Sequence, residues 1–459
     1  MQSQVGKQRS NINVGRLSLR EKISYGCGDL GLCLITTVMS TFLMFYYTDV
    51  VEIGLGSIGL IMMTGSLFDA VSDPLMGVIV DKTNSKWGKC RPYLLFTPMI
   101  VLVAAFLVFN VPKESSESSK FIYALITYIA YNLSYTLFNI PYQTMMASIT
   151  DNQNDRLSIS MFKTLGSSSS QLFINAFALS IVAMLGKGSS YHGYRMAILL
   201  LGSVGVVFMI ICFANTKERI IPPKSEKISL KDNLRAFKNL PWAITCLTIL
   251  ILITVAVMRA QQTMYYTQYV LQDISIASKL LAIPSAVSVI VAMATPKIAV
   301  KFGKRNVVIG GVSIAIIGTI GVWLSGHNIN MIFVCAIISA VGAALPIGVG
   351  YVMLAESIDY GEWKNGKRVQ GILMAFTGCG VKLGISVSSI ISTSVLNAGG
   401  YESNLAVQSQ SAITAITINY IWIPVMFYVL IIVANLFYKL DNMYPQIREE
   451  LENRRRGIE

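Results

Sequence analysis

The sequence predicts an all-α membrane protein of twelve transmembrane helices in two six-helix bundles, and three observations predict this class. Of 459 residues, 53% are hydrophobic and only 13% are charged, whereas about 25% charged residues is usual in soluble globular proteins. Apolar runs long enough to cross a bilayer recur along the whole chain. Basic residues gather in alternate connections between these runs, as the positive-inside rule requires.

Each apolar run can form one membrane span, because about 20 mostly apolar residues cross roughly 30 Å of hydrocarbon. The twelve runs begin near residues 24, 55, 94, 120, 157, 194, 241, 277, 306, 330, 370 and 414. The longest charged connection lies between the sixth and seventh runs. We therefore expect an N-terminal segment over 1–22, a first bundle over 23–215, a linker over 216–240, a second bundle over 241–440 and a tail over 441–459.

The basic residues are divided unequally between the two sides of the membrane. Of the 37 Lys and Arg residues, 29 fall in the termini and in every second connection, and five fall in the opposite connections. We therefore expect a multi-pass protein of the cell inner (plasma) membrane with both termini cytoplasmic. Topology also explains the net charge of +13 better than nucleic-acid binding does.

The motifs of enzymes and of ATP-driven pumps are missing from the sequence. There is no G-x-x-x-x-G-K-[ST], G-x-S-x-G or H-E-x-x-H pattern, and both histidines fall in predicted outer loops. The seven cysteines form no C-x-x-C pair and mostly lie within spans, where they act as small hydrophobic residues. We expect no enzyme activity, no cofactor and no metal site other than one for a coupling ion.

Six ionisable residues remain inside the predicted spans. A charge near the middle of a span costs about 2.5 to 3.5 kcal/mol, so such residues normally face a partner or a water-filled cavity. Ion pairs that lock helices together are one explanation, and a polar cavity for substrate and ion is the other. The residues are Asp29, Asp69, Asp73, Lys163, Arg259 and Lys382.

The fourth span carries polar and aromatic residues at spacings of three and four, which place them on one helical face. Hydroxyls and amides can bind the hydroxyls of a sugar, and aromatic rings can stack on its C–H face. Helix packing is the alternative role for the tyrosines. The residues are Tyr128, Tyr131, Asn132, Tyr135, Asn139 and Tyr142.

Asp69 and Asp73 lie one helical turn apart. Their charges repel if both are ionised, so the pair favours a bridging monovalent cation or a proton on one carboxylate. Either outcome makes the local charge depend on ion occupancy. The pair therefore predicts an ion-coupled carrier.

Several segments resemble the signatures of the glycoside-pentoside-hexuronide:cation symporters, a branch of the major facilitator superfamily that includes melibiose permease. The resemblance covers nearly the whole chain in order. It implies the major facilitator fold and cation-coupled symport of a glycoside, pentoside or hexuronide by alternating access. The segments are SYGCGD (24–29), FYYTDVV (45–51), DAVSDPLMGVIVDKTNSKWGKCRP (69–92), SYTLFNIPY (134–142) and DYGEWKNGKRVQG (359–371).

The resemblance also implies roles for individual residues. Asp69 and Asp73 would form the cation site, with Thr136 and Asn139 approaching from the fourth span. The substrate-binding or coupling residues would be Asn139, Gln143, Lys163 and Lys382, to which we add Asp29, Tyr135 and Arg259 as candidates.

Some positions depart from melibiose permease. Cys33 replaces a sugar-binding Asp, with Asp29 one turn earlier, and Asn139, Gln143 and Lys163 replace an Asp, a Trp and an Arg. The substitutions point to the glucuronide and xyloside branches of the family. A neutral Asn139 leaves the two aspartates to supply the charge of the site, which favours a proton over sodium, although Na⁺ at Asp69 and Asp73 stays open.

Arg259 has two open interpretations. A guanidinium binds a carboxylate or a sulfonate bidentately, so Arg259 is a candidate for an acidic substrate group, or else a partner for Asp29 or Asp69. A sulfonated sugar or a lysolipid as cargo, and a sugar sensor without transport, remain alternative functions. The expected partners are a small sugar or glycoside and the lipid bilayer, with no nucleic acid, and the chain is expected to be a monomer.

Charged connections of both signs predict a cytoplasmic gate. Loop charge is often only topological, but both signs occur together after the second and the tenth spans. The gate candidates are Asp81, Arg91, Asp359, Glu362 and Arg368.

Overall fold

The computed structural model describes residues 17–150, 152–219, 237–366, 369–403, 405 and 407–456. Within them, twelve helical segments are long and apolar enough to cross a membrane. The predicted all-α fold with twelve spans is confirmed. The chain is a multi-pass membrane protein.

The first six spans come from residues 19–215. They are α1 (Leu19–Phe45) with its continuation η1 (Tyr46–Val50), α2 (Leu55–Lys82), α3 (Arg91–Val108), α4 (Glu117–Ile149), α5 (Gln153–Gly186) and α6 (Ser190–Asn215). Side-chain caps begin three of them, since Ser18, Ser116 and Ser189 accept hydrogen bonds from backbone N–H groups in the first turn of α1, α4 and α6.

The second six spans come from residues 240–436, and a further helix follows them. They are α8 (Leu240–Tyr265) with η2 (Tyr266–Val270), α9 (Ala277–Phe302) after the short η3 (Ile274–Ile276), α10 (Lys304–Leu324), α11 (Ile329–Asn365), α12 (Gln370–Ala398), and α13 (Gln410–Thr417) with η4 (Ile418–Trp422) and α14 (Ile423–Leu436). The helix α15 (Leu440–Arg456) completes the described chain.

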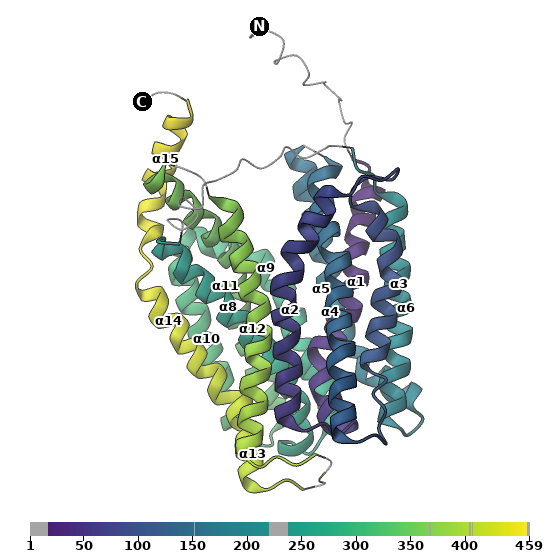
Figure 1. Ribbon diagram of the computed structural model, residues 1–459. Helices are drawn as coiled ribbons and strands as arrows, with labels where there is room; N and C mark the ends of the chain where they lie inside the picture. Colours follow the sequence, from purple (N-terminus) through teal and green to yellow (C-terminus); the bar gives the residue numbers. More distant parts are fainter. Residues whose placement is uncertain are drawn as a thin grey trace.

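The helices form two bundles, α1 to α6 and α8 to α14, which Figure 1 shows side by side. The bundles approach each other at the end that carries α13 and diverge toward the end that carries α15 and the start of α1. We call the end that carries α15 and the start of α1 the terminal end. We call the end that carries α13 the opposite end. The bundles touch where α2 packs on α12, α5 on α9 and α1 on α8.

Helices α2 and α12 run antiparallel across the seam between the bundles. Gly59 lies against Thr393 at one level, and Ser66 exchanges a hydrogen bond with Ser386 at the next. Asp69 and Asp73 lie one and two turns beyond Ser66 on α2, and this register places them opposite Lys382 on α12. The central contact of the molecule therefore joins the two bundles.

Two glycines set the close helix contacts that position the polar residues. A Cβ on Gly26 of α1 would collide with the backbone of Phe162 on α5, so these helices touch directly and Asp29 comes close to Lys163. A Cβ on Gly65 of α2 would collide with Tyr128 and Asn132 of α4. Small residues allow such close packing in membrane helices, as they do elsewhere.

The bundles are joined by polar side chains at the opposite end. The hydroxyls of Thr48 on η1 and Tyr265 on α8 lie 2.6 Å apart. Asp49 accepts hydrogen bonds from Tyr269 on η2 at 2.5 Å and from Tyr401 at 2.6 Å. These contacts close the seam at this end.

At the terminal end, α15 packs along the second bundle. Its apolar side chains Leu440, Ile447 and Leu451 are buried in the core of that bundle. Asp441 accepts a hydrogen bond from the backbone N–H of Arg305, at the start of α10, at 2.7 Å. The helix therefore ties α10 and α11 together on this face.

Candidate functional site

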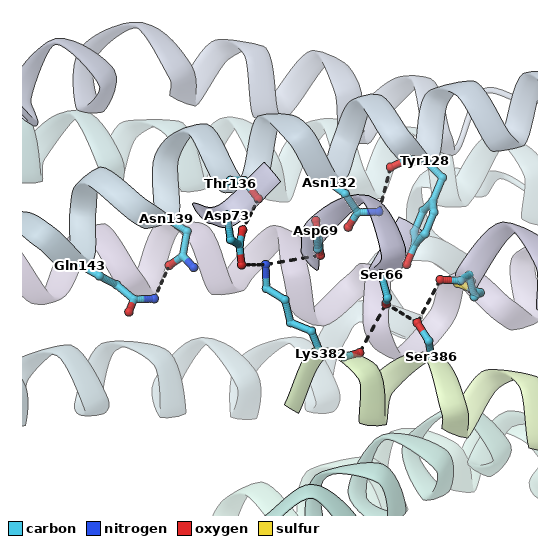
Figure 2. Close-up of polar contacts among 11 residues, drawn as sticks. Ser66, Asp69, Asp73, Tyr128, Asn132, Thr136, Asn139, Gln143, Lys382 and Ser386 are labelled. Carbon is cyan, nitrogen blue, oxygen red and sulfur yellow. Dashed lines mark hydrogen bonds and ion pairs between the residues drawn. The ribbon is translucent and has the colours of Figure 1, made fainter. Parts of the chain in front are cut away.

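Lys382 reaches across the seam and lies between Asp69 and Asp73 (Figure 2). Its Nζ is 2.5 Å from Asp73 Oδ2 and 3.5 Å from Asp69 Oδ2. The exposed fraction of the side chain is only 21% for Lys382, 18% for Asp73 and 10% for Asp69. Because Lys382 comes from α12 and both carboxylates come from α2, this cluster depends on the contact between the two bundles.

Other side chains hold the carboxylates in place. Thr136 of α4 donates a hydrogen bond to Asp73 Oδ1 at 2.8 Å, and the Gly65 contact brings α4 close enough for it. Asp69 Oδ1 is buried and has no hydrogen-bond partner. A buried acceptor without a partner is costly, so this oxygen offers a place for a cation or a proton.

The charges of the cluster sum to −1 when both acids and Lys382 are ionised. One monovalent cation, or one proton, would therefore neutralise it. Without Lys382, an external cation could bind between Asp69 and Asp73. The ammonium of Lys382 occupies that position. The arrangement can exchange an internal ammonium for an external cation.

Asn139 and Gln143 lie farther along α4 from Lys382 (Figure 2). Gln143 donates a hydrogen bond from Nε2 to Asn139 Oδ1 at 3.1 Å. Asn139 is buried and Gln143 is exposed. Of the four candidate cation-coupling residues, the structure brings Asp69, Asp73 and Thr136 into hydrogen-bonded or ionic contact, and Asn139 contacts Gln143 instead.

A second group of candidates gathers in the first bundle. Asp29 of α1 lies within electrostatic range of Lys163 and near Ser167, both on α5. Lys163 Nζ lies 5.8 Å from the centre of the Tyr142 ring. Tyr142 stacks on Tyr25 with ring centres 4.6 Å apart, which fixes α4 against α1.

Tyr135 connects the two groups. Lys382 Nζ lies 5.6 Å from the centre of its ring, and the side chain is within electrostatic range of Asp29 as well as of Asp69 and Asp73. An aromatic ring between the charge cluster and the first-bundle polar group suits a sugar, whose apolar face stacks on rings.

Arg259 lies away from these groups, inside the second bundle. Its Nη1 donates to Ser339 at 2.5 Å and to Thr319 at 3.4 Å, and its guanidinium lies 5.2 Å from the centre of the Tyr420 ring. Among the described residues, Arg259 forms no ion pair with Asp29 or Asp69. Its contacts come from α10, α11 and η4 and, through Tyr428, from α14.

The gate candidates of the first bundle are held within that bundle. Arg91 donates a hydrogen bond to the backbone oxygen of Phe213 at 3.2 Å and stacks 4.7 Å from the centre of its ring. Glu218 accepts hydrogen bonds from the backbone N–H groups of Lys89, Cys90 and Arg91 at 2.9, 2.7 and 3.0 Å. Asp81 is exposed in the last turn of α2.

Two gate candidates of the second bundle, Asp359 and Glu362, lie on α11, which extends through a segment that we predicted to be a loop. Asp359 accepts a hydrogen bond from the Tyr444 hydroxyl of α15 at 2.9 Å. No ion pair within the described residues joins Asp81 or Arg91 to Asp359 or Glu362. Arg368 lies outside the described residues.

Sequence reasoning missed three residues of these sites. Ser66 and Ser386 join α2 to α12 beside the charge cluster, and the run of small hydroxyl residues at 386–393 was the available signal. Glu218 had no signal, because an acid in a charged linker looks like solvated surface.

These features together define a secondary transporter: two six-helix bundles with an ionic cluster at their seam. The chain matches the MFS/sugar transport protein family over residues 24–442 and belongs to it. The isoprimeverose transporter of Lactiplantibacillus pentosus is 36% identical over 97% of this chain and 94% of its own length. The glucuronide carrier protein homolog of Escherichia coli is 28% identical over 96% of this chain and 97% of its own.

The fold is also that of solved transporters. A bacterial homologue of the human lysosomal transporter Spinster superposes with a TM-score of 0.64 at 13% identity, covering 94% of this chain and 97% of that one. The nucleoside transporter NupG superposes with a TM-score of 0.63 at 15% identity over 91% and 99%. The family and the fold are thus those of transporters rather than of enzymes, and the resemblance to sugar symporters is confirmed.

Proposed function

We propose that this chain is a sugar symporter in which the ionic cluster of Asp69, Asp73 and Lys382 binds the coupling cation. The position of Lys382 carries the proposal, because an ammonium already occupies the acid pair from the other bundle. Relatives named as sugar transporters and symporters support it. The two bundles would be the moving units, as in other transporters with a central site between repeats.

The termini are proposed to lie in the cytoplasm, following the distribution of basic residues. The terminal end is then the inner face, and the bundles diverge there (Figure 1). At the outer face, Asp49 and Thr48 join the bundles. The outer face is then the closed one in this conformation.

Coupling follows from the charge of the cluster. In this conformation Lys382 contacts both carboxylates and neutralises one of their two charges. When a cation takes over this role, Lys382 is released from α2 and the contact between α2 and α12 weakens. Ion occupancy and bundle position are then linked, because the same carboxylates serve both the lysine and the cation.

We propose a proton as the coupling ion in preference to sodium. Sodium needs several oxygen ligands, and Asn139, where a third carboxylate stands in melibiose permease, accepts a hydrogen bond from Gln143 on its only side-chain oxygen. A proton needs only one carboxylate oxygen, and Asp69 Oδ1 is buried without a partner.

The substrate is proposed to be a glycoside, pentoside or hexuronide bound by the first bundle. Asp29, Tyr135 and Lys163 line up across α1, α4 and α5, with Asn139 and Gln143 farther along α4. Isoprimeverose and a glucuronide are the cargo named for two relatives, which supports this class. The chain is proposed to act as a monomer in the plasma membrane.

Uptake into vesicles tests the proposal. Proteoliposomes or membrane vesicles are given an inward proton gradient, an inward sodium gradient or neither, and a panel of xylosides, glucuronides and galactosides. We expect concentrative uptake of a panel sugar under the proton gradient, and its loss in both Asp69→Asn and Asp73→Asn. Accumulation of no panel sugar under either gradient would reject symport, and sodium-driven uptake alone would reject the proton.

Counterflow separates transport from sensing. A transporter exchanges labelled for unlabelled sugar without any gradient, whereas a sensor binds sugar without exchange.

The contacts of Arg259 with Ser339 and Thr319 favour a structural role. Arg259→Lys should therefore reduce xyloside and glucuronide uptake alike, while a selective loss of glucuronide uptake would assign it to the substrate carboxylate.

A further inference from the structure

A polar surface cavity of about 620 Å³ lies at the opposite end of the molecule. Its walls come from both bundles and are mostly polar. None of Asp69, Asp73 and Lys382 lines it, so it is distinct from the central cluster. Its polar lining residues include Asp49, Lys113, Ser189, Ser190, Gln268 and Gln272.

Asp49 belongs both to the cavity wall and to the closed seam. Only 6% of its surface is exposed. Its carboxylate accepts hydrogen bonds from the hydroxyls of Tyr269 and Tyr401 in the second bundle at 2.5 and 2.6 Å, and from Thr48 at 2.6 Å. Hydrogen bonds to a charged acceptor are stronger than neutral ones, so Asp49 is a main polar tie between the bundles at this end.

Gln268 lies in the same wall, next to Tyr269 in η2. Its Oε1 is buried and has no hydrogen-bond partner in the structure. A buried amide oxygen without a donor is unfavourable unless another molecule supplies one. The hydroxyl of a sugar is such a donor.

The backbone around the cavity is also unusual. Three non-glycine residues in the described chain have positive φ, namely Glu52 at 64°, Lys187 at 44° and Gln272 at 57°. Gln272 and Gly188, the residue after Lys187, line the cavity, and Glu52 pairs at 3.8 Å with Lys113 of its wall. Glycine is the usual residue at such helix ends, and strained backbone tends to gather around ligand sites.

We infer that this cavity is an outer sugar-binding site at which sugar hydroxyls replace the Tyr269 and Tyr401 hydroxyls on Asp49. The exchange is one hydroxyl for another, so the carboxylate stays hydrogen-bonded while the tie between the bundles is broken. Gln268 accepts a further sugar hydroxyl. Sugar arriving from outside would then favour opening of the outer face, and the inference rests on the proposed function in this respect.

Labelling of an introduced cysteine tests the site. In right-side-out vesicles, the Ser190→Cys variant is treated with a membrane-impermeant maleimide, with and without methyl β-xyloside or methyl β-glucuronide. All seven native cysteines are buried or half-buried, and the unmodified chain gives the background. We expect one of these sugars to slow labelling severalfold. Ser118→Cys, an exposed position at the start of α4 outside the cavity, should label at the same rate with or without sugar.

Variants separate this site from the central one. Gln268→Ala and Asp49→Asn should each remove the protection of Ser190→Cys. Lys382→Ala should abolish gradient-driven uptake yet leave protection intact. Gln268→Ala keeps the test decisive if Asp49→Asn does not fold.

Two outcomes would overturn the inference. One is the absence of protection by a sugar that the same vesicles accumulate, and the other is protection that is lost with Lys382→Ala but kept with Gln268→Ala. Protection without any accumulation would instead reject symport and leave the outer site standing. The two proposals therefore fail separately.

Discussion

The ammonium of Lys382, on α12 of the second bundle, lies 2.5 Å from the carboxylate of Asp73, on α2 of the first. This ion pair joins the bundles near the middle of both helices, and Asp69 flanks it at 3.5 Å. Because its partners belong to different bundles, the pair cannot be kept unchanged if the bundles rock apart. Binding of an ion at this pair therefore depends on the conformation of the two bundles.

Removing Lys382 should leave two partly buried carboxylates without their cation. We expect Lys382→Ala to lower the free energy of unfolding by about 3 kcal/mol. This is the lower end of the range for breaking a buried ion pair, because all three side chains are partly exposed. Gradient-driven uptake should be lost. Thermal unfolding and vesicle uptake measure the two effects, with Lys439→Ala, an exposed lysine, as the matched control. Unchanged uptake in Lys382→Ala would contradict the cluster's role.

The cluster charge of −1 predicts one cation for each sugar. With a neutral sugar, transport should carry one positive charge inward per molecule, measurable as a current on a supported membrane alongside uptake of labelled sugar. In Asp73→Asn the cluster is already neutral, so counterflow should persist while the gradient no longer drives accumulation. A wild-type ratio of two charges per sugar would be inconsistent with a single site.

Two glycines of α2 make a matched pair for testing the helix packing. A Cβ at Gly65 meets Tyr128 and Asn132, whereas a Cβ at Gly77 meets nothing within 4 Å. Gly65→Ala should therefore destabilise the protein by about 1 to 3 kcal/mol through overpacking and reduce uptake, since it moves α4 and Thr136 away from Asp73. Gly77→Ala should be neutral or slightly stabilising, because Ala is the better helix former. Equal effects of the two changes would refute this packing.

Glu218 should matter for movement at the terminal end, although no pattern in the sequence indicated it. Its carboxylate accepts from three backbone N–H groups at the start of α3, where a negative charge is favourable by up to about 2 kcal/mol. Glu218→Gln should slow transport with little change in sugar affinity, while Glu449→Gln on exposed α15 surface should not. Initial uptake rates over a range of sugar concentrations measure both, and a selective loss of affinity would argue against this role.

The Cys90 thiol should be unreactive in the folded protein. Burial, reinforced by the Glu218 carboxylate, raises the pKa of Cys90 to about 12, and only the thiolate reacts with maleimide. Labelling at pH 8 should therefore spare Cys90 until the chain unfolds. Since the folded pKa lies above the usual value of about 8.5, this group's stabilising effect is complete below pH 8.5 and is lost as the pH rises toward 12. Mass spectrometry of labelled protein gives the answer, and rapid modification at pH 8 would contradict burial of the thiol.

The neighbourhoods of Asp69 and Arg259 show how far sequence reasoning reached. The spacing of Asp69 and Asp73 predicted a bridging monovalent cation or a proton, which stays a prediction, and the structure places Lys382 between the two acids, as in the ion-pair alternative. For Arg259, an acidic partner and an acidic substrate were the options considered, yet Ser339 and Thr319 hold it inside its own bundle. Neutral hydroxyls give no charge signal in a sequence, so they could not be paired with Arg259 beforehand.

Helix ends were also hard to place from hydropathy. Asp81 falls in the last turn of α2, and Asp359 and Glu362 fall within α11, which continues to Asn365. Hydropathy indicates only where the membrane-buried part of a helix ends. The helix can continue into water when its polar turns pack on a neighbouring helix, as α11 does on α15. The loops that we expected there are shorter than predicted.

Sequence alone is enough to identify the membrane class, the twelve spans and the residues that carry charge into the membrane, because these follow from the local cost of burying polar groups in hydrocarbon. The contact of Lys382 with Asp73 across the seam, and the closure of the opposite end by Asp49, follow from the tertiary structure. Residues more than 200 positions apart meet through helix register and bundle orientation. Those depend on glycine contacts and packing between bundles, which no local pattern in the sequence specifies.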